Sequence, residues 1–138
     1  CLPAISATGT SSATAPAGFV LSASQELNNK VGLVLYSEFG RDASPFGTGG
    51  ILCVKAPTRR SKGFNSGGTA PPAADCTGVF SIDFNTFARG LLGTPPNPAT
   101  YLSLSGQVVT AQFWGRDPGI PLPNNFSLSN GLEYTVGP

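Results

Sequence analysis

Glycine and proline divide this chain into short segments, and this division limits its fold more than any other feature does. The 138 residues contain 18 Gly and 13 Pro. Both residues oppose long helices, whereas short runs of β-branched and aromatic residues between turns are typical of strands. At this length the chain forms one domain with a single core. We therefore predict an all-β domain, a single β-sandwich or β-barrel of about seven to eight strands.

Alternating apolar and polar side chains indicate where the strands lie. Phe80, Ile82 and Phe84 alternate with mostly polar neighbours, so one face of this segment should meet the core. Residues 30–39 carry apolar side chains on both faces, which predicts a central strand buried on both sides. The other expected strands are residues 2–8, 18–25, 51–55, 106–117 and 132–136, and residues 85–93 hold the one expected helical turn.

The first residues form a short strand-like segment that a polar linker separates from the rest. Residues 9–18 contain no apolar anchor larger than Ala, apart from one proline, and ten extended residues can span up to roughly 33 Å. The segment can pair within its own domain, as most strands do, or act as a donor strand for another protomer. The candidate donor residues are Leu2, Ala4, Ile5 and Ala7, and the chain divides into residues 1–18, strand and linker, and residues 19–138, the sandwich or barrel domain.

The composition excludes most catalytic chemistry. The chain has no histidine, which removes Ser/His and Cys/His nucleophile pairs and the usual Cys/His zinc sites. Its seven carboxylates are scattered singly, and its Gly-rich segments match neither a phosphate-binding loop nor a dinucleotide fingerprint. We expect no enzymatic activity, no cofactor and no metal site.

Charge and hydropathy limit the partners. The net charge is +1 and only 11% of residues are charged, so the chain has no electrostatic reason to bind nucleic acid or anionic lipid. No apolar run approaches the roughly 20 residues of a membrane-spanning helix. We expect neither a nucleic-acid partner nor a membrane span.

The three cysteines suggest an oxidising compartment. Cys53 lies in a predicted strand, Cys76 precedes another, and a polar Gly-rich loop separates them, so we predict a Cys53–Cys76 disulfide, with two buried free thiols as the alternative. Cys1 then remains as a candidate for an intermolecular bond, for a bond to an upstream residue, or for lipidation.

Aromatic residues and one tripeptide suggest contacts with sugars. Trp114, Tyr36, Tyr101 and Tyr134 could form a stacking platform for carbohydrate, although large aromatic residues more often fill a core. Asn125 begins the sequence NFS, which is a candidate N-glycosylation acceptor.

Several segments together resemble a domain found in many secreted bacterial proteins of unassigned activity. They are ISATGTSSATAPAGFVLSAS, VGLVLYSEFGRDASPFGTGGILCV, ADCTGVFSIDFN, QFWGRDP and NFSLSNGLEYTV. In that family a cysteine at the position of Cys1 looks paired with one upstream, and Cys53 with Cys76. The fold also resembles subunits of extracellular pilus-like fibrils, in which the N-terminal strand of one protomer completes the sheet of another.

Two functions follow as expectations. The first is a structural subunit of an extracellular, pilus-like filament, a helical homopolymer in which other copies of the chain are the partners. The alternative is a C-terminal adhesion or carbohydrate-binding β-sandwich module of a larger secreted protein, with glycans as ligands.

Overall fold

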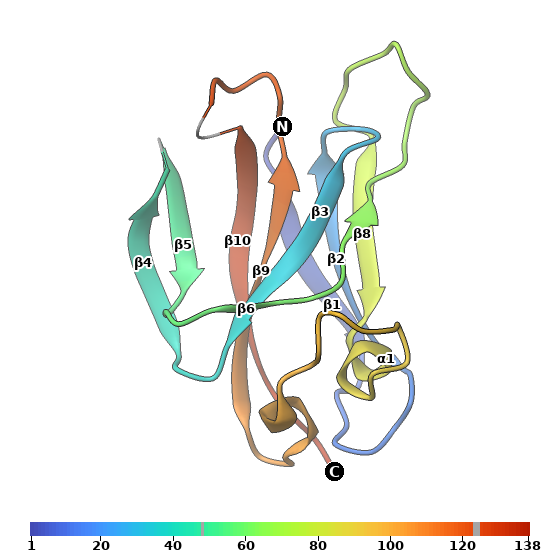
Figure 1. The fold of residues 1–138 in the computed structure, drawn as a ribbon, viewed down its shortest axis with the longest axis vertical. Coiled ribbons are helices and arrows are strands. Elements are labelled where there is room, and N and C mark those ends of the chain that lie inside the picture. Colours follow the sequence, from blue (N-terminus) through green and yellow to red (C-terminus); the bar gives the residue numbers. More distant parts are fainter. Residues whose placement is uncertain (48, 123–124) are drawn as a thin grey trace.

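The computed structural model, which describes residues 1–47, 49–122 and 125–138, confirms an all-β domain (Figure 1). Its sheets are open and form a sandwich-like arrangement without a closed barrel among the described strands. None of the described helices is long and apolar enough to span a membrane. The strands are β1 (Ala4–Gly9), β2 (Phe19–Glu26), β3 (Val31–Ser37), β4 (Arg41–Phe46), β5 (Gly50–Val54), β6 (Arg59–Arg60), β7 (Phe64–Asn65), β8 (Gly78–Asp83), β9 (Val108–Arg116) and β10 (Phe126–Thr135), and the helices are α1 (Phe84–Ala88) and the 3-10 helix η1 (Thr100–Ser103).

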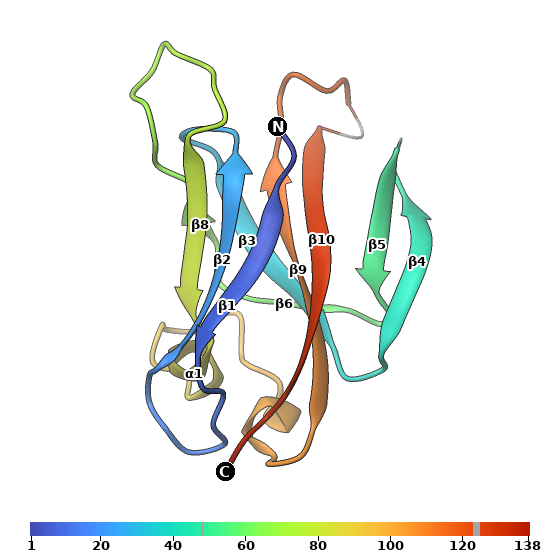
Figure 2. The same ribbon diagram turned by 180° about the vertical axis from the view of Figure 1, so that it is seen from behind.

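Two antiparallel sheets face each other, and a separate hairpin lies against one of them. The first sheet has the strand order β1-β2-β8, and the second has the order β10-β9-β3-β6, with β7 also paired to β3. Strands β4 and β5 pair only with each other among the described strands. Both views of the molecule place this hairpin beside β10, on the side away from β8 (Figures 1 and 2).

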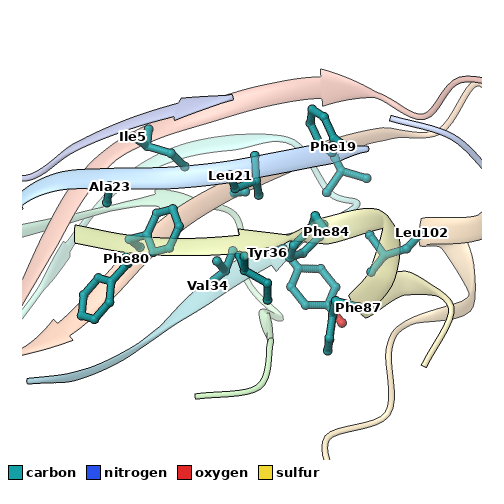
Figure 3. Packing of buried hydrophobic residues seen from close by; sticks show 14 of the residues in the cluster. Ile5, Phe19, Leu21, Ala23, Val34, Tyr36, Phe80, Phe84, Phe87 and Leu102 are labelled. Carbon is teal, nitrogen blue, oxygen red and sulfur yellow. The ribbon is translucent and has the colours of Figure 1, made fainter. Parts of the chain in front are cut away.

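The core lies between the two sheets, on the faces that the alternation predicts. Phe80 of the first sheet and Phe113 of the second are both fully buried, and their rings stack with centroids 6.0 Å apart and planes 8° apart. Close packing of the labelled residues continues along the interior from Ala23 to Leu102 (Figure 3). The predicted inward face of Phe80, Ile82 and Phe84 is therefore confirmed.

Strand β3 is buried on one face only, which differs from the expectation. Val34 and Tyr36 are fully buried, whereas Val31 is 53% exposed. The reason is the position of the β4–β5 hairpin, because β5 packs mainly against β9 and β10. The sequence analysis did not predict β4, whose Pro45 is atypical of a strand interior and is tolerated at the edge of a sheet.

The close approach of the two sheets can be tested by a substitution at Gly32 on β3. A methyl carbon there would lie less than 3.0 Å from three ring atoms of Phe80. We expect Gly32→Ala to lower the free energy of unfolding by roughly 1–3 kcal/mol, because a close-packed core accommodates added volume only by distortion. Gly63→Ala is the control, since its added carbon would come no closer than 3.6 Å to another atom. Equal unfolding midpoints in urea for the two variants would contradict the described packing.

Candidate assembly interface

Strand β1 lies in the seam between the two sheets. It pairs antiparallel with β2 over Ala4–Gly9, opposite Phe19–Ser24. Its other edge faces β10, as Figure 2 shows, and among the described strands it forms a backbone ladder only with β2. The amide of Ile5 instead donates a hydrogen bond to Oδ1 of Asn130, at 2.9 Å. One strand thus bridges two sheet edges but is hydrogen-bonded along its length to one of them.

Of the candidate donor residues, Ile5 alone is buried. It is 9% exposed and lies opposite Ala23, close to Leu21 (Figure 3). Leu2 is 83% exposed, and Ala4 and Ala7 are also exposed. Burial of an isoleucine side chain contributes roughly 1.5–3 kcal/mol, so β1 has one main apolar anchor in addition to its ladder.

The linker after β1 is bonded to the body of the domain, which the sequence analysis did not predict. Ser12 pairs in parallel with Gly137, and its hydroxyl donates to the carbonyl of Pro138 at 2.6 Å. Asn85, which is 2% exposed, accepts from the amide of Ser12 and donates to the carbonyls of Thr10 and Ala17. The chain from β1 to Ser12 therefore contacts both sheets and closes the seam between them.

The closed linker depends on a glycine. Gly9 has a φ of +82°, and a side chain there would collide with the carbonyl of Gly18. The amide of Thr10 donates to that same carbonyl at 2.9 Å, which closes the loop between β1 and β2. Residues 16–18 at the end of the loop are exposed. The turn thus needs the left-handed conformation that glycine adopts without strain.

The predicted Cys53–Cys76 disulfide is wrong. Cys1 is bonded to Cys76, with the Cα atoms 5.4 Å apart, and Cys53 is a free thiol. The reason is topological: β5, which carries Cys53, packs against β9 and β10, whereas Cys76 precedes β8 of the other sheet. The bond implied by the family resemblance, between Cys1 and an upstream cysteine, is likewise replaced by an intrachain bond.

The loop that carries Cys76 is organised by Asn28. This residue is 2% exposed, and its side-chain amide donates to the carbonyls of Thr69 and Ala73, at 2.6 and 2.8 Å. Its Oδ1 accepts from the amide of Asp75 at 2.9 Å. Cys76 is therefore held near the start of β1 by interactions that do not involve β1.

Gln112 holds the β4–β5 hairpin against the second sheet. It is fully buried, and its Oε1 accepts from the amide of Cys53 at 3.0 Å. Its Nε2 donates to the carbonyls of Ile51 and Ser129, at 2.9 and 2.6 Å. The neighbourhood of Cys53 is thus a junction of β5, β9 and β10.

Glu26 is a buried carboxyl at the end of β2. The ladder to β8 shifts register between Ala23 and Glu26, and Gln25 has a φ of +59°, so the chain bulges just before Glu26. Glu26 is 2% exposed, and its Oε1 finds no hydrogen-bond partner among the described residues. Burial first, and the charge of Asp117 second, raise its pKa to about 7, while a hydrogen bond from Ser127 and the N-terminal ammonium act in the opposite direction.

The aromatic platform, the less favoured of the two interpretations, does not form. Tyr36 is fully buried, and Tyr134 packs against Phe19 with ring centroids 4.7 Å apart. Tyr101 packs against Tyr36 at 6.0 Å, whereas Trp114 lies beside Phe126, at 6.1 Å. The tyrosines thus fill the core and its margin, which is the alternative that large aromatic residues favour.

The remaining candidates carry little chemistry. Asn125 is half-buried, and its carbonyl accepts from the amide of Asp117 at 2.8 Å; glycosylation of its side chain stays a prediction. The described residues contain no group of three or more acidic or cysteine side chains that could hold a metal ion.

No protein-family model, curated protein or solved structure matches this chain. The resemblance to secreted bacterial domains and pilus-like subunits therefore stays a prediction.

Glu26 predicts a pH dependence of stability. Its folded pKa of about 7 exceeds the ordinary 4.5, so between these values the folded state binds more protons than the unfolded state. Stability must therefore fall as the pH rises through this window, by up to roughly 3 kcal/mol from this group. Asp75 and Asp83, whose pKa values hydrogen bonds lower, affect stability only in more acidic solution.

We expect Glu26→Gln to remove most of this fall, as measured by urea unfolding at about pH 5 and about pH 8. The exposed Glu38→Gln is the matched control. An unchanged pH dependence in Glu26→Gln would show that Glu26 titrates normally in the folded protein.

Proposed function

We propose that this chain is a structural subunit of an extracellular filament, in which β1 of one protomer occupies the seam of the next. The observation that carries the proposal is the position of β1. Strand β1 lies between two sheet edges, it has a ladder on one side only among the described strands, and Ile5 is its one buried side chain. Such a strand can leave the domain without breaking the rest of the core.

The vacant seam would attract another copy of the same strand. Loss of β1 leaves the edge of β2 unpaired and uncovers the pocket of Ile5, next to Leu21 and Ala23. Unpaired main-chain groups beside an apolar cleft are a ready template for an added strand. An exchanged β1 restores the same ladder and the same buried side chain, and a head-to-tail contact of this kind grows without closing on itself.

The composition of the linker supports an exchange. The hydrogen bonds of Ser12 and Asn85 hold its first half, and residues 16–18 are hydrogen-bonded to the domain at its other end. The amides of Thr14 and Ala15, between these two groups, donate within the linker to the hydroxyl of Ser12. A hinge at Thr14 and Ala15 would let β1 and Ser12 move together into a neighbour and keep their contacts there. The disulfide supports an oxidising location, which for this filament is the cell exterior.

Shortening the linker tests the exchange, because it strains the closed loop but not a linker that runs on into a neighbouring protomer. Deletion of Thr14 and Ala15 shortens the connection between Ser12, which is paired with Gly137, and Gly18, whose amide donates to Asp83. A strain of roughly 1–3 kcal/mol in the closed form should raise the assembled fraction about fivefold or more. The measurement is sedimentation and negative-stain microscopy of protein refolded at high concentration with the disulfide reduced.

Two controls complete this test. Replacement of Thr14 and Ala15 by glycine keeps the length of the loop and should not promote assembly. Deletion of residues 1–9 should abolish assembly, and a peptide of residues 1–12 should restore part of the lost stability. Filaments from the chain that lacks residues 1–9, or a variant without Thr14 and Ala15 that stays monomeric, would contradict the proposal and leave the binding-module alternative.

A further inference from the structure

We infer that the Cys1–Cys76 disulfide is the covalent lock of the assembly, joining the donated β1 of one protomer to the Cys76 loop of the next. This inference rests on the proposed function, since it requires β1 to be exchanged. The inference states that the bond joins two copies of this chain and that it forms after strand exchange.

The bond lies at the end of β1 that is remote from the linker. Cys1 precedes the first residue of the strand, Ala4, and Cys76 precedes Gly78, the first residue of β8. Because β2 lies between β1 and β8 in the sheet, the disulfide ties together the two outer strands of this three-stranded sheet. It therefore holds the strand that the proposal exchanges at the end opposite to the linker.

The protomer that receives β1, here called the acceptor protomer, holds its own Cys76 in place. Asn28 fixes the loop through the carbonyls of Thr69 and Ala73 and through the amide of Asp75, and none of these groups belongs to β1. The ladder to β2 sets the register of β1. An exchanged strand in that register places its Cys1 beside the acceptor's Cys76, with the same Cα separation of 5.4 Å as in the closed chain.

The connectivity dictates when the bond forms. A closed intrachain bond links residues 1 and 76 into a ring, so β1 of an oxidised monomer cannot leave its own domain. Exchange must therefore precede oxidation. A small-molecule disulfide is the oxidant: one cysteine thiolate attacks it and expels a thiolate, and the second cysteine then attacks the mixed disulfide and expels the other. The two cysteines lose two protons and two electrons, and the reagent becomes two thiols.

Cys53 lies outside the proposed bond, so it can be replaced by serine in the test. Cys53 lies on β5, in the hairpin that Gln112 holds against the other sheet. It is partly buried, whereas Cys1 and Cys76 are exposed to an oxidant. All chains in the experiment except one control therefore carry Cys53→Ser.

The experiment separates the two cysteines onto different chains. One full-length variant carries Cys1→Ser and Cys53→Ser, and the other carries Cys76→Ser and Cys53→Ser with a tag that changes its mass. Neither can close an intrachain bond. The two are mixed reduced, refolded together at high concentration, imaged, and then treated with oxidised glutathione. Non-reducing electrophoresis with peptide mapping should identify a covalent heterodimer joined by Cys1 and Cys76 as the main species.

Two further chains serve as comparisons, and the first of them is oxidised under two conditions. The Cys53→Ser chain, with Cys1 and Cys76 both present, should give a ladder of covalent oligomers if it is assembled before oxidation. The same chain should give intrachain monomers if it is oxidised while dilute. A Cys1→Ser, Cys76→Ser chain, which keeps only the thiol of Cys53, should give no heterodimer with the Cys1-bearing chain.

The possible outcomes test the intermolecular disulfide and the proposed strand exchange separately. Filaments with no Cys1–Cys76 heterodimer would overturn the covalent lock and leave strand exchange standing. Neither filaments nor heterodimer would overturn the proposed function and the lock together. A heterodimer as abundant with the Cys53-only chain would show unspecific oxidation and would also overturn the lock.

Discussion

The ladder between β1 and β2 is the interaction on which the rest of the arrangement depends. Through it the first strand covers the edge of β2, and through Ile5 it fills the apolar pocket between the sheets. The segment that follows, up to Ser12, then joins the C-terminal end of the chain at Gly137. Without these contacts the sandwich would have an open seam along its full height, which is the condition for strand exchange.

The closed and the exchanged forms contain nearly the same contacts, so their balance depends on the linker and on concentration. In the monomer a short linker holds β1 near its site at an effective concentration in the millimolar range. Exchange therefore requires a high local protein concentration or a strained loop between Ser12 and β2. A disulfide that closes after exchange would make the assembly independent of this balance, since bond exchange is slow without a reductant.

Much of the fold was predictable because periodicity is a local signal. The alternation of Phe80, Ile82 and Phe84 located β8 and its buried face, and the same pattern located β1, β2, β5 and β9. The burial of the tyrosines also follows from ordinary side-chain preferences. The β4–β5 hairpin could not be placed, because Pro45 obscures β4 and the residues that fix the hairpin on the sheet, Gln112, Phe126 and Glu133, come about sixty or more positions later in the chain.

The site was less predictable, because its key residues act across long sequence separations. Asn28, Asn85 and Gln112 are ordinary polar residues in the sequence, yet each is at most 2% exposed and bonds to a distant backbone. The prediction of the disulfide was wrong for the same reason, because the residues next to Cys53 and Cys76 do not indicate on which sheet each cysteine lies. The linker has the composition of a flexible spacer, yet both of its halves are hydrogen-bonded to the domain.

The most direct test of the account is electron cryomicroscopy of filaments assembled from the full chain, at a resolution that traces the linker. The density after β1 should run from Ser12 through residues 13–18 to β2 of a neighbouring sandwich, with Ile5 of one chain seated beside Leu21 and Ala23 of the next. A linker that turns back after Ser12 and returns to β2 of the same sandwich would contradict strand exchange.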